Sequence, residues 1–149
     1  MKKAFFLIAM AIITFTACKK KTTTPAPNNN TVASFTWTEN GGATITADSA
    51  FWVTGAWGTG IRAFKGAGLS NYFEINWATQ NNTSVGAKTL TVGTDFTFLQ
   101  GANTYTNPSA ETLNITAFAN DKMSGNCTVA VTGGPITTLV CTFTDIPKD

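Results

Sequence analysis

The chain has 149 residues, of which 43% are hydrophobic and 12% charged, and enough of it remains after the N-terminal segments described below to form one domain of ordinary size. It contains no histidine, which excludes histidine-based nucleophile activation, histidine-ligated zinc sites and the HExxH motif. The formal net charge is +2, but five basic residues stand against eight acidic ones from Thr31 onward, so the domain itself is negative and a nucleic-acid partner is not expected.

Residues 1–17 have the layout of a secretory signal peptide. Two lysines precede an apolar stretch over 4–15, and the small residue Ala17 stands just before Cys18. A helix over 4–17 would be about 21 Å long, which is short of the roughly 30 Å hydrocarbon core of a bilayer. An ordinary secretory signal with a cysteine near its end would have the same layout.

Phe15, Thr16, Ala17 and Cys18 resemble a lipobox, the cleavage site of bacterial lipoprotein precursors, with Phe15 where leucine is usual. This resemblance implies that residues 1–17 are removed. It also implies that Cys18 becomes the mature N-terminus and carries a diacylglyceryl thioether and an amide-linked acyl chain. Two or three acyl chains hold a protein stably at a bilayer, whereas one chain holds it only marginally.

Residues 18–32 connect the lipidated cysteine to the domain. Three lysines follow Cys18 and are suited either to anionic headgroups or simply to water. The rest is Thr, Pro and Asn, which cannot bury enough apolar area to fold, so we expect a flexible tether that spaces the domain some 20–30 Å from the membrane. No acidic pair follows Cys18, a pair that in related lipoproteins often marks export to the cell surface. We expect an outer-membrane anchor with the domain in the periplasm, and surface display remains open.

Residues 33–149 alternate between apolar and polar side chains in short runs rich in Thr, Val, Ile and Phe, a pattern typical of β-strands. Turn-forming combinations of Gly, Asn, Pro and Ser separate the runs, and no window has helical spacing. We expect a single antiparallel β-sandwich of eight or nine strands, with one face of each sheet toward water. The clearest runs are 33–38, 43–47, 72–78, 94–99, 112–118, 127–132 and 136–144.

The Gly-rich segment 50–60, AFWVTGAWGTG, contains Trp52 and Trp57 and is expected to be a loop. An exposed ring in this loop could stack on a sugar or anchor a partner protein, and Tyr105 is a further candidate for such a contact. The alternative is that the loop packs its rings onto the core.

Glu74 is the only acidic residue in the middle of a predicted strand, and it shares a face with Tyr72 and Asn76. This face could be a polar platform for a ligand, or simply the solvated side of a one-sided sheet. A hydrolase would have to act through Glu74 and a second acid. We expect neither catalysis nor a metal or cofactor.

The last predicted hairpin has a register that can be derived from its turn. Pairing the strands symmetrically about Gly134 sets Cys127 opposite Cys141 and Val129 opposite Leu139, with all four on one face. Opposed residues have Cα atoms within disulfide range, so Cys127 and Cys141 are expected to be bonded in an oxidising compartment. The alternative is a pair of buried thiols that pack as small hydrophobes.

The stretches 112–131 and 139–147 resemble the C-terminal half of a group of small lipid-anchored envelope β-domains of unknown function. In that group a small-Gly-x-aromatic pattern leads to a second strand with Gly-Thr-Phe. The departures are the two cysteines, which stand where the group has the aromatic residue and the glycine. The resemblance implies a fold and no activity. The matching residues are Ser124, Gly125, Asn126, Thr142 and Phe143.

These observations together predict a lipid-anchored cell-envelope protein whose domain is a non-enzymatic binding or structural module. The alternative is a glycan-binding lipoprotein that uses Trp52, Trp57 or Tyr105, and a hydrolase acting through Glu74 is a distant third. The expected partners are the membrane, through the lipid anchor, and a glycan or an envelope protein.

Overall fold

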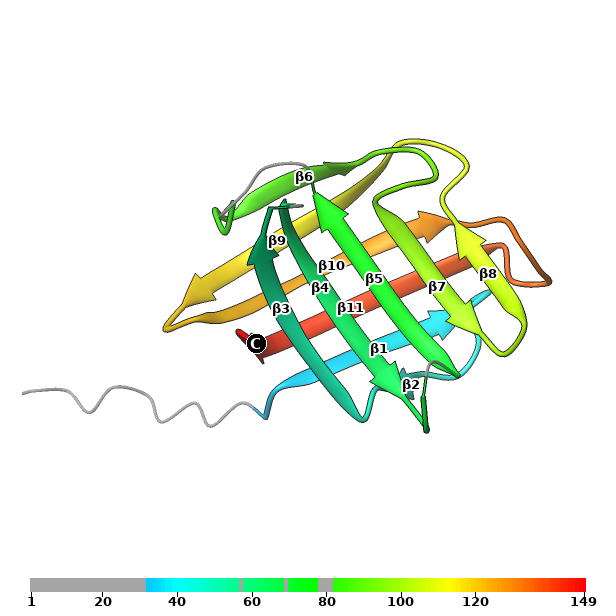
Figure 1. Ribbon diagram of the computed structural model, residues 1–149, viewed down its shortest axis with the longest axis horizontal. Coiled ribbons are helices and arrows are strands. Elements are labelled where there is room, and N and C mark those ends of the chain that lie inside the picture. Colours follow the sequence, from blue (N-terminus) through cyan, green and yellow to red (C-terminus); the bar gives the residue numbers. More distant parts are fainter. Residues whose placement is uncertain (1–31, 57, 69, 78–81) are drawn as a thin grey trace, which may run out of the picture.

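The fold is built from β-strands alone in the part of the chain that the structure describes (Figure 1). The structure, a computed structural model, describes residues 32–56, 58–68, 70–77 and 82–149. The strands are β1 (Ser34–Glu39), β2 (Ile45–Thr46), β3 (Ser49–Gly55), β4 (Gly58–Lys65), β5 (Asn71–Trp77), β6 (Gly86–Leu90), β7 (Phe96–Gln100), β8 (Asn103–Thr106), β9 (Glu111–Ala119), β10 (Lys122–Ala130) and β11 (Thr138–Pro147).

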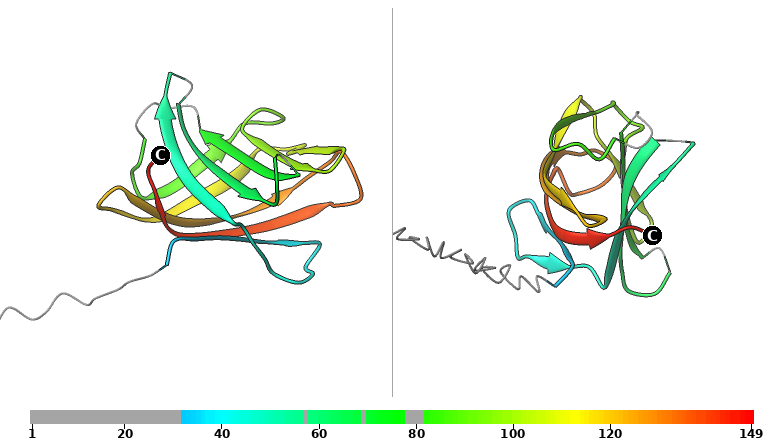
Figure 2. Two further views of the ribbon diagram at one scale, coloured as in Figure 1. Left: turned by 60° about the horizontal axis from the view of Figure 1, so that its bottom comes forward. Right: turned by 90° about the vertical axis from the view of Figure 1, so that its left-hand side faces the viewer.

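Two antiparallel sheets pack face to face, which confirms the predicted all-β sandwich. One sheet has six strands in the order β2-β1-β11-β10-β9-β6, and the other has five in the order β3-β4-β5-β7-β8. Figures 1 and 2 show that the strands of the two sheets cross at a large angle, an arrangement that lets both inner faces meet over a single core. The predicted signal peptide, Cys18, the tether up to Thr31, and Trp57 lie outside the described residues.

The structure has more strands than the eight or nine predicted, and two of them, β3 and β4, form a hairpin in the Gly-rich segment that was expected to be a loop. Strands β3 and β4 pair from Ser49 with Phe64 to Gly55 with Gly58. Glycine weakens a strand pattern because it has no side chain to pack, and inside a strand it often marks a place where other groups approach the backbone closely. Gly60 in β4 is such a place, as the site below shows.

The register predicted for the last hairpin is confirmed. Cys127 lies opposite Cys141 and Val129 opposite Leu139 in the ladder between β10 and β11. All four side chains are buried. The apolar pattern therefore determines both the face that is buried and the pairing, because a slip of one residue would turn the whole apolar set toward water.

The predicted disulfide between Cys127 and Cys141 is wrong for this structure, in which both residues are free, buried thiols. Directly opposed residues keep their Cβ atoms about 4.5–5.5 Å apart, whereas a disulfide needs about 3.5–4.5 Å. Register alone therefore does not bring two opposed cysteines into bonding geometry. A hydrogen bond with the Cys127 thiol, together with burial, raises the pKa of Cys141 well above its usual value.

The core is a cluster of aromatic rings between the sheets. Phe73 of β5 is its centre, since its ring centroid lies 5.1 Å from Phe35, 5.0 Å from Trp37 and 4.2 Å from Phe98. Each of these four side chains is at most 1% exposed. Aromatic side chains bury 150–250 Å² each, so this cluster provides much of the apolar burial that stabilises the domain.

Two bridges join the sheets along their sides. The backbone of Trp52 in β3 pairs with Lys148 just after β11, and Thr106 at the end of β8 pairs with Thr132. The two edge strands of the five-stranded sheet, β3 and β8, are thereby joined to the six-stranded sheet. The outer face of the five-stranded sheet is not covered by any described strand (Figure 1).

Candidate functional site

The outer face of the five-stranded sheet carries a cluster of aromatic and polar side chains. Ile61, Phe73 and Ile75 point inward and are buried, so strand alternation directs their neighbours outward. These outward side chains are only half-buried. We call the cluster the platform, and it consists of Phe51 on β3, Arg62 and Phe64 on β4, and Tyr72, Glu74 and Asn76 on β5.

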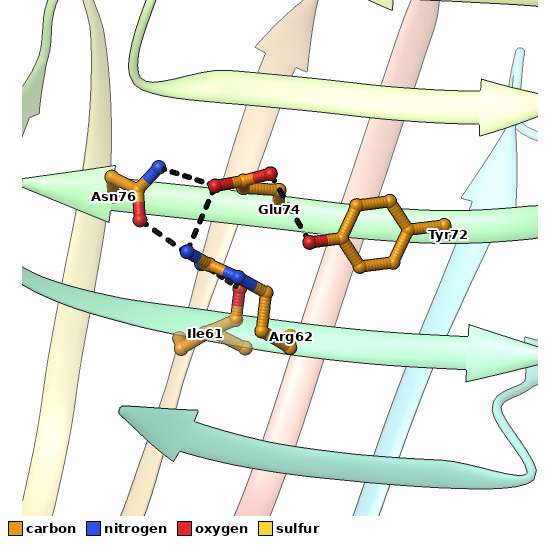
Figure 3. Close-up of polar contacts among 5 residues, drawn as sticks. All are labelled: Ile61, Arg62, Tyr72, Glu74 and Asn76. Atoms are coloured by element: carbon orange, nitrogen blue, oxygen red, sulfur yellow. Dashed lines mark hydrogen bonds and ion pairs between the residues drawn. The ribbon is translucent and has the colours of Figure 1, made fainter. Parts of the chain in front are cut away.

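Glu74 is the centre of the polar part of the platform (Figure 3). Its Oε1 accepts hydrogen bonds from Arg62 Nη2 at 2.8 Å and from Asn76 Nδ2 at 3.1 Å, and its Oε2 accepts one from the Tyr72 hydroxyl at 3.1 Å. Arg62 Nη1 donates to Asn76 Oδ1 at 2.9 Å and to the Ile61 carbonyl at 3.0 Å. The four polar side chains therefore hold one another in a closed network.

Strand register explains why these residues meet. Arg62 lies directly opposite Glu74 in the ladder between β4 and β5, and Phe64 lies opposite Tyr72. Opposite charges in facing positions stabilise a sheet by roughly 0.2–1 kcal/mol. The ion pair is also partly shielded from water, since the Arg62 side chain is only 19% exposed and that of Glu74 35%.

Gly60 creates the space in which the Arg62 guanidinium lies. It is opposite Asn76 in the ladder, and it is buried although it belongs to the outward set of β4. A Cβ atom at this position would lie 2.7 Å from Arg62 Nη1 and closer still to Asn76 Oδ1. The missing side chain allows the guanidinium to lie against the strand.

The aromatic part of the platform is a row of three rings on three adjacent strands. The ring centroids of Phe51 and Phe64 are 5.8 Å apart with an interplanar angle of 27°, and those of Phe64 and Tyr72 are 5.0 Å apart with an angle of 37°. The overlapping rings form a continuous apolar strip, and Tyr72 joins this strip to the polar network through its hydroxyl.

Tyr72 is held in its protonated state by its surroundings. Burial raises its pKa to about 12, with the nearby Glu74 carboxylate adding to the rise and Arg62 opposing it. At neutral pH the phenol is protonated, as an ordinary tyrosine also is, and it donates its hydrogen bond to Glu74. The raised pKa extends this protonated state to higher pH.

The structure separates the five residues predicted as ligand contacts. Tyr72 and Glu74 lie together in the platform. Trp52 and Tyr105 are 3% and 0% exposed, so their rings belong to the core and offer no face to a ligand at the surface. Trp57 lies outside the described residues.

Buried Trp52 has a structural role instead. Its indole N–H donates to the Asp121 carbonyl at 3.0 Å, and the Lys148 ammonium lies 5.3 Å from the ring centroid. Tyr105 stacks on Phe98, and its hydroxyl has no hydrogen-bond partner among the described residues.

Sequence reasoning grouped Tyr72, Glu74 and Asn76 on one face but missed the residues of β3 and β4. Arg62 and Phe64 are two positions apart, which would place them on one face of a strand, but the surrounding glycines indicated a loop. Phe51 could have been added to this group only if the Gly-rich segment had been predicted as a hairpin.

The opposite outer face, on the six-stranded sheet, has a different chemistry. Its outward positions along β1, β11, β10, β9 and β6 are mostly Thr and Asn, and the residues that interleave with them are buried. Rows such as Thr36 opposite Thr142, and Thr128 opposite Thr112, follow from strand register. Among the described residues, this face has neither an aromatic strip nor an ion-pair network like that of the platform.

The described residues contain no group of three or more Cys, Asp or Glu side chains placed to hold a metal ion. They also contain no helix long and apolar enough to cross a membrane. Comparison of the chain with protein-family models, with curated proteins and with solved structures gives no match.

Proposed function

We propose that the chain is a lipid-anchored protein of the bacterial outer membrane, whose β-sandwich is a non-enzymatic binding module in the periplasm or at the cell surface. The observation that carries the binding function is the platform. It places a closed polar network beside an aromatic strip on a sheet face that no described strand covers.

The order of segments along the chain supports the anchor. An apolar stretch and a lipobox-like sequence end at Cys18, a polar segment follows, and the first strand begins at Ser34. Val32, the first described residue, is 84% exposed, so the chain enters the domain from its surface and a tether can reach it there. An anchor of two or three acyl chains would hold such a domain stably near the bilayer.

The contacts of Glu74 support binding rather than hydrolysis. Both of its oxygens already accept hydrogen bonds, one of them from the guanidinium of Arg62. Its neighbours across the sheet are Arg62 and Thr97, and neither is an acid. A hydrolase that works with two carboxylates needs a second acid facing the first across a cleft.

Mass spectrometry and a change of signal peptide test the anchor. The intact mass of protein extracted from membranes should equal residues 18–149 plus a diacylglyceryl group and one acyl chain. A variant in which a conventional cleavable secretory signal replaces residues 1–18 should move to the soluble periplasmic fraction. An unacylated native chain, or a replaced variant that stays in the membrane fraction, would contradict the proposal.

A further inference from the structure

We propose that the platform binds a neutral linear oligosaccharide, in contact with about two sugar units. This inference rests on the proposed binding function and names its ligand class. It differs from glycan capture by Trp52 or Tyr105, whose rings are buried.

The size of the platform fits a small ligand. It spans three strands and three alternate positions along β5, which corresponds to about 10 Å by 13 Å at ordinary strand spacings. A stable interface between proteins needs roughly 800 Å² on each partner, several times this area. A disaccharide unit is about as long as the aromatic strip, which crosses three strands and is about 10 Å long.

The charge of the platform fits a neutral ligand. The platform has one cation, Arg62, and one anion, Glu74. Arg62 Nη2 lies 2.8 Å from Glu74 Oε1, so the two charges neutralise each other. A phosphate, sulfate or carboxylate group would have to compete with Glu74 for the guanidinium, and a cationic group would have to compete with Arg62. A ligand with hydroxyl groups can bind beside the ion pair without breaking it.

The two halves of the platform match the two kinds of surface on a sugar ring. The strip formed by Phe51, Phe64 and Tyr72 can cover apolar C–H groups, and aromatic side chains supply much contact area at low entropic cost. The adjacent network presents donors and acceptors together. Within the described part of the chain, the bonds of Arg62 use three of the five N–H groups of a guanidinium, which leaves two donors for hydroxyl oxygens.

The network is also held in place before a ligand arrives. The Ile61 carbonyl and Asn76 fix the guanidinium above Gly60, and Glu74 fixes the Tyr72 hydroxyl. Side chains that are already ordered lose little rotamer freedom on binding, which favours affinity for a small ligand.

Calorimetric titration of the mature acylated protein in lipid nanodiscs tests this inference. The probes are maltohexaose, cellohexaose, chitohexaose, laminarihexaose and xylohexaose, with a heparin hexasaccharide as the charged comparator. At least one neutral probe should bind, and the heparin fragment should not. Phe64→Ala should weaken binding by about tenfold or more. The Tyr72→Phe variant keeps the ring and removes the hydroxyl, so it should weaken binding less. Thr128→Ala on the opposite sheet is the matched control and should leave the affinity unchanged.

Three results would overturn the inference: no binding of any neutral probe, binding of the heparin fragment alone, or equal affinity in wild type and Phe64→Ala. Circular dichroism of each variant shows whether it is folded. If Phe64→Ala does not fold, Tyr72→Phe and Asn76→Ala take its place, and unchanged affinity in both would also overturn the inference. The proposed function is judged separately by the acylation and fractionation of the same preparation. An acylated, membrane-bound protein that binds no oligosaccharide would refute only the ligand class.

Discussion

Gly60 and Arg62, two positions apart on β4, are in contact because one has no side chain and the other lies across it. A Cβ atom at Gly60 would be 2.7 Å from Arg62 Nη1. Gly60 is one of the glycines that made this segment resemble a loop in the sequence. It is also the residue that leaves room for the guanidinium beside Glu74 and Asn76.

Replacing Gly60 by alanine should displace the Arg62 guanidinium and destabilise the domain by about 1–3 kcal/mol, because the backbone carbonyl of Ile75 also lies too close to the new methyl group. Urea denaturation measures the loss. Gly55→Ala in the same hairpin is the control, since a Cβ atom there has no heavy atom within 4 Å, and it should change the stability by less than about 0.5 kcal/mol. Equal effects of the two substitutions would show that the contact is unimportant.

Tyr72 should titrate near pH 12 in the folded protein, which spectrophotometric titration of wild type against Tyr72→Phe can isolate. Its folded pKa lies above the unfolded value near 10, so its contribution to stability is complete below pH 10 and is lost as the pH rises toward 12. The unfolding free energy of wild type should therefore fall more steeply than that of Tyr72→Phe over this range. Glu74→Gln should lower the pKa of Tyr72, because it removes the neighbouring negative charge. Parallel pH profiles for wild type and Tyr72→Phe would contradict the burial of the phenol.

Lys88 should be replaceable by methionine without loss of stability. Its side chain points between the sheets and is 9% exposed, and among the described residues its ammonium donates to two neutral atoms, Asn82 Oδ1 at 2.9 Å and Ser84 Oγ at 2.7 Å. The two ion pairs in the described part of the chain do not include it. Because a buried ammonium without a carboxylate is expensive to desolvate, Lys88→Met should leave the unfolding free energy unchanged or raise it by about 1–2 kcal/mol. Lys122→Met, at an exposed position, should be neutral. A loss above about 1 kcal/mol in Lys88→Met alone would show that the ammonium is a net stabilising group.

Cys127 and Cys141 should behave as two protected thiols. The hydrogen bond with Cys127 and burial raise the pKa of Cys141, and the thiolate is the reactive form. Alkylating reagents should therefore modify neither residue in the folded protein and both in urea without prior reduction. Intact mass before and after alkylation measures this. Alkylation in urea only after treatment with a reductant would reveal a disulfide and refute the free-thiol structure.

The alternation of side chains along the chain was sufficient to predict the fold class and the register of the last hairpin. Both are local properties, because burying every second residue of a strand against one core determines which face turns inward. The same reasoning placed Tyr72, Glu74 and Asn76 together. This reasoning failed for β3 and β4, where glycines interrupt the alternation. Trp52 was therefore a candidate for exposure, although Phe51 is the outward residue of β3 and Trp52 is buried.

The alternation of apolar and polar residues is enough to predict that this chain forms strands and which side chains of one strand share a face. The packing of the whole domain places β4 between β3 and β5, which sets Arg62 opposite Glu74 and brings Phe51, Phe64 and Tyr72 into one row. The same packing leaves Cys127 and Cys141 as free thiols. The physical reason is the same in both cases. Strand order and the separation of opposed side chains depend on how distant segments pack, and no periodicity within a single segment carries that information.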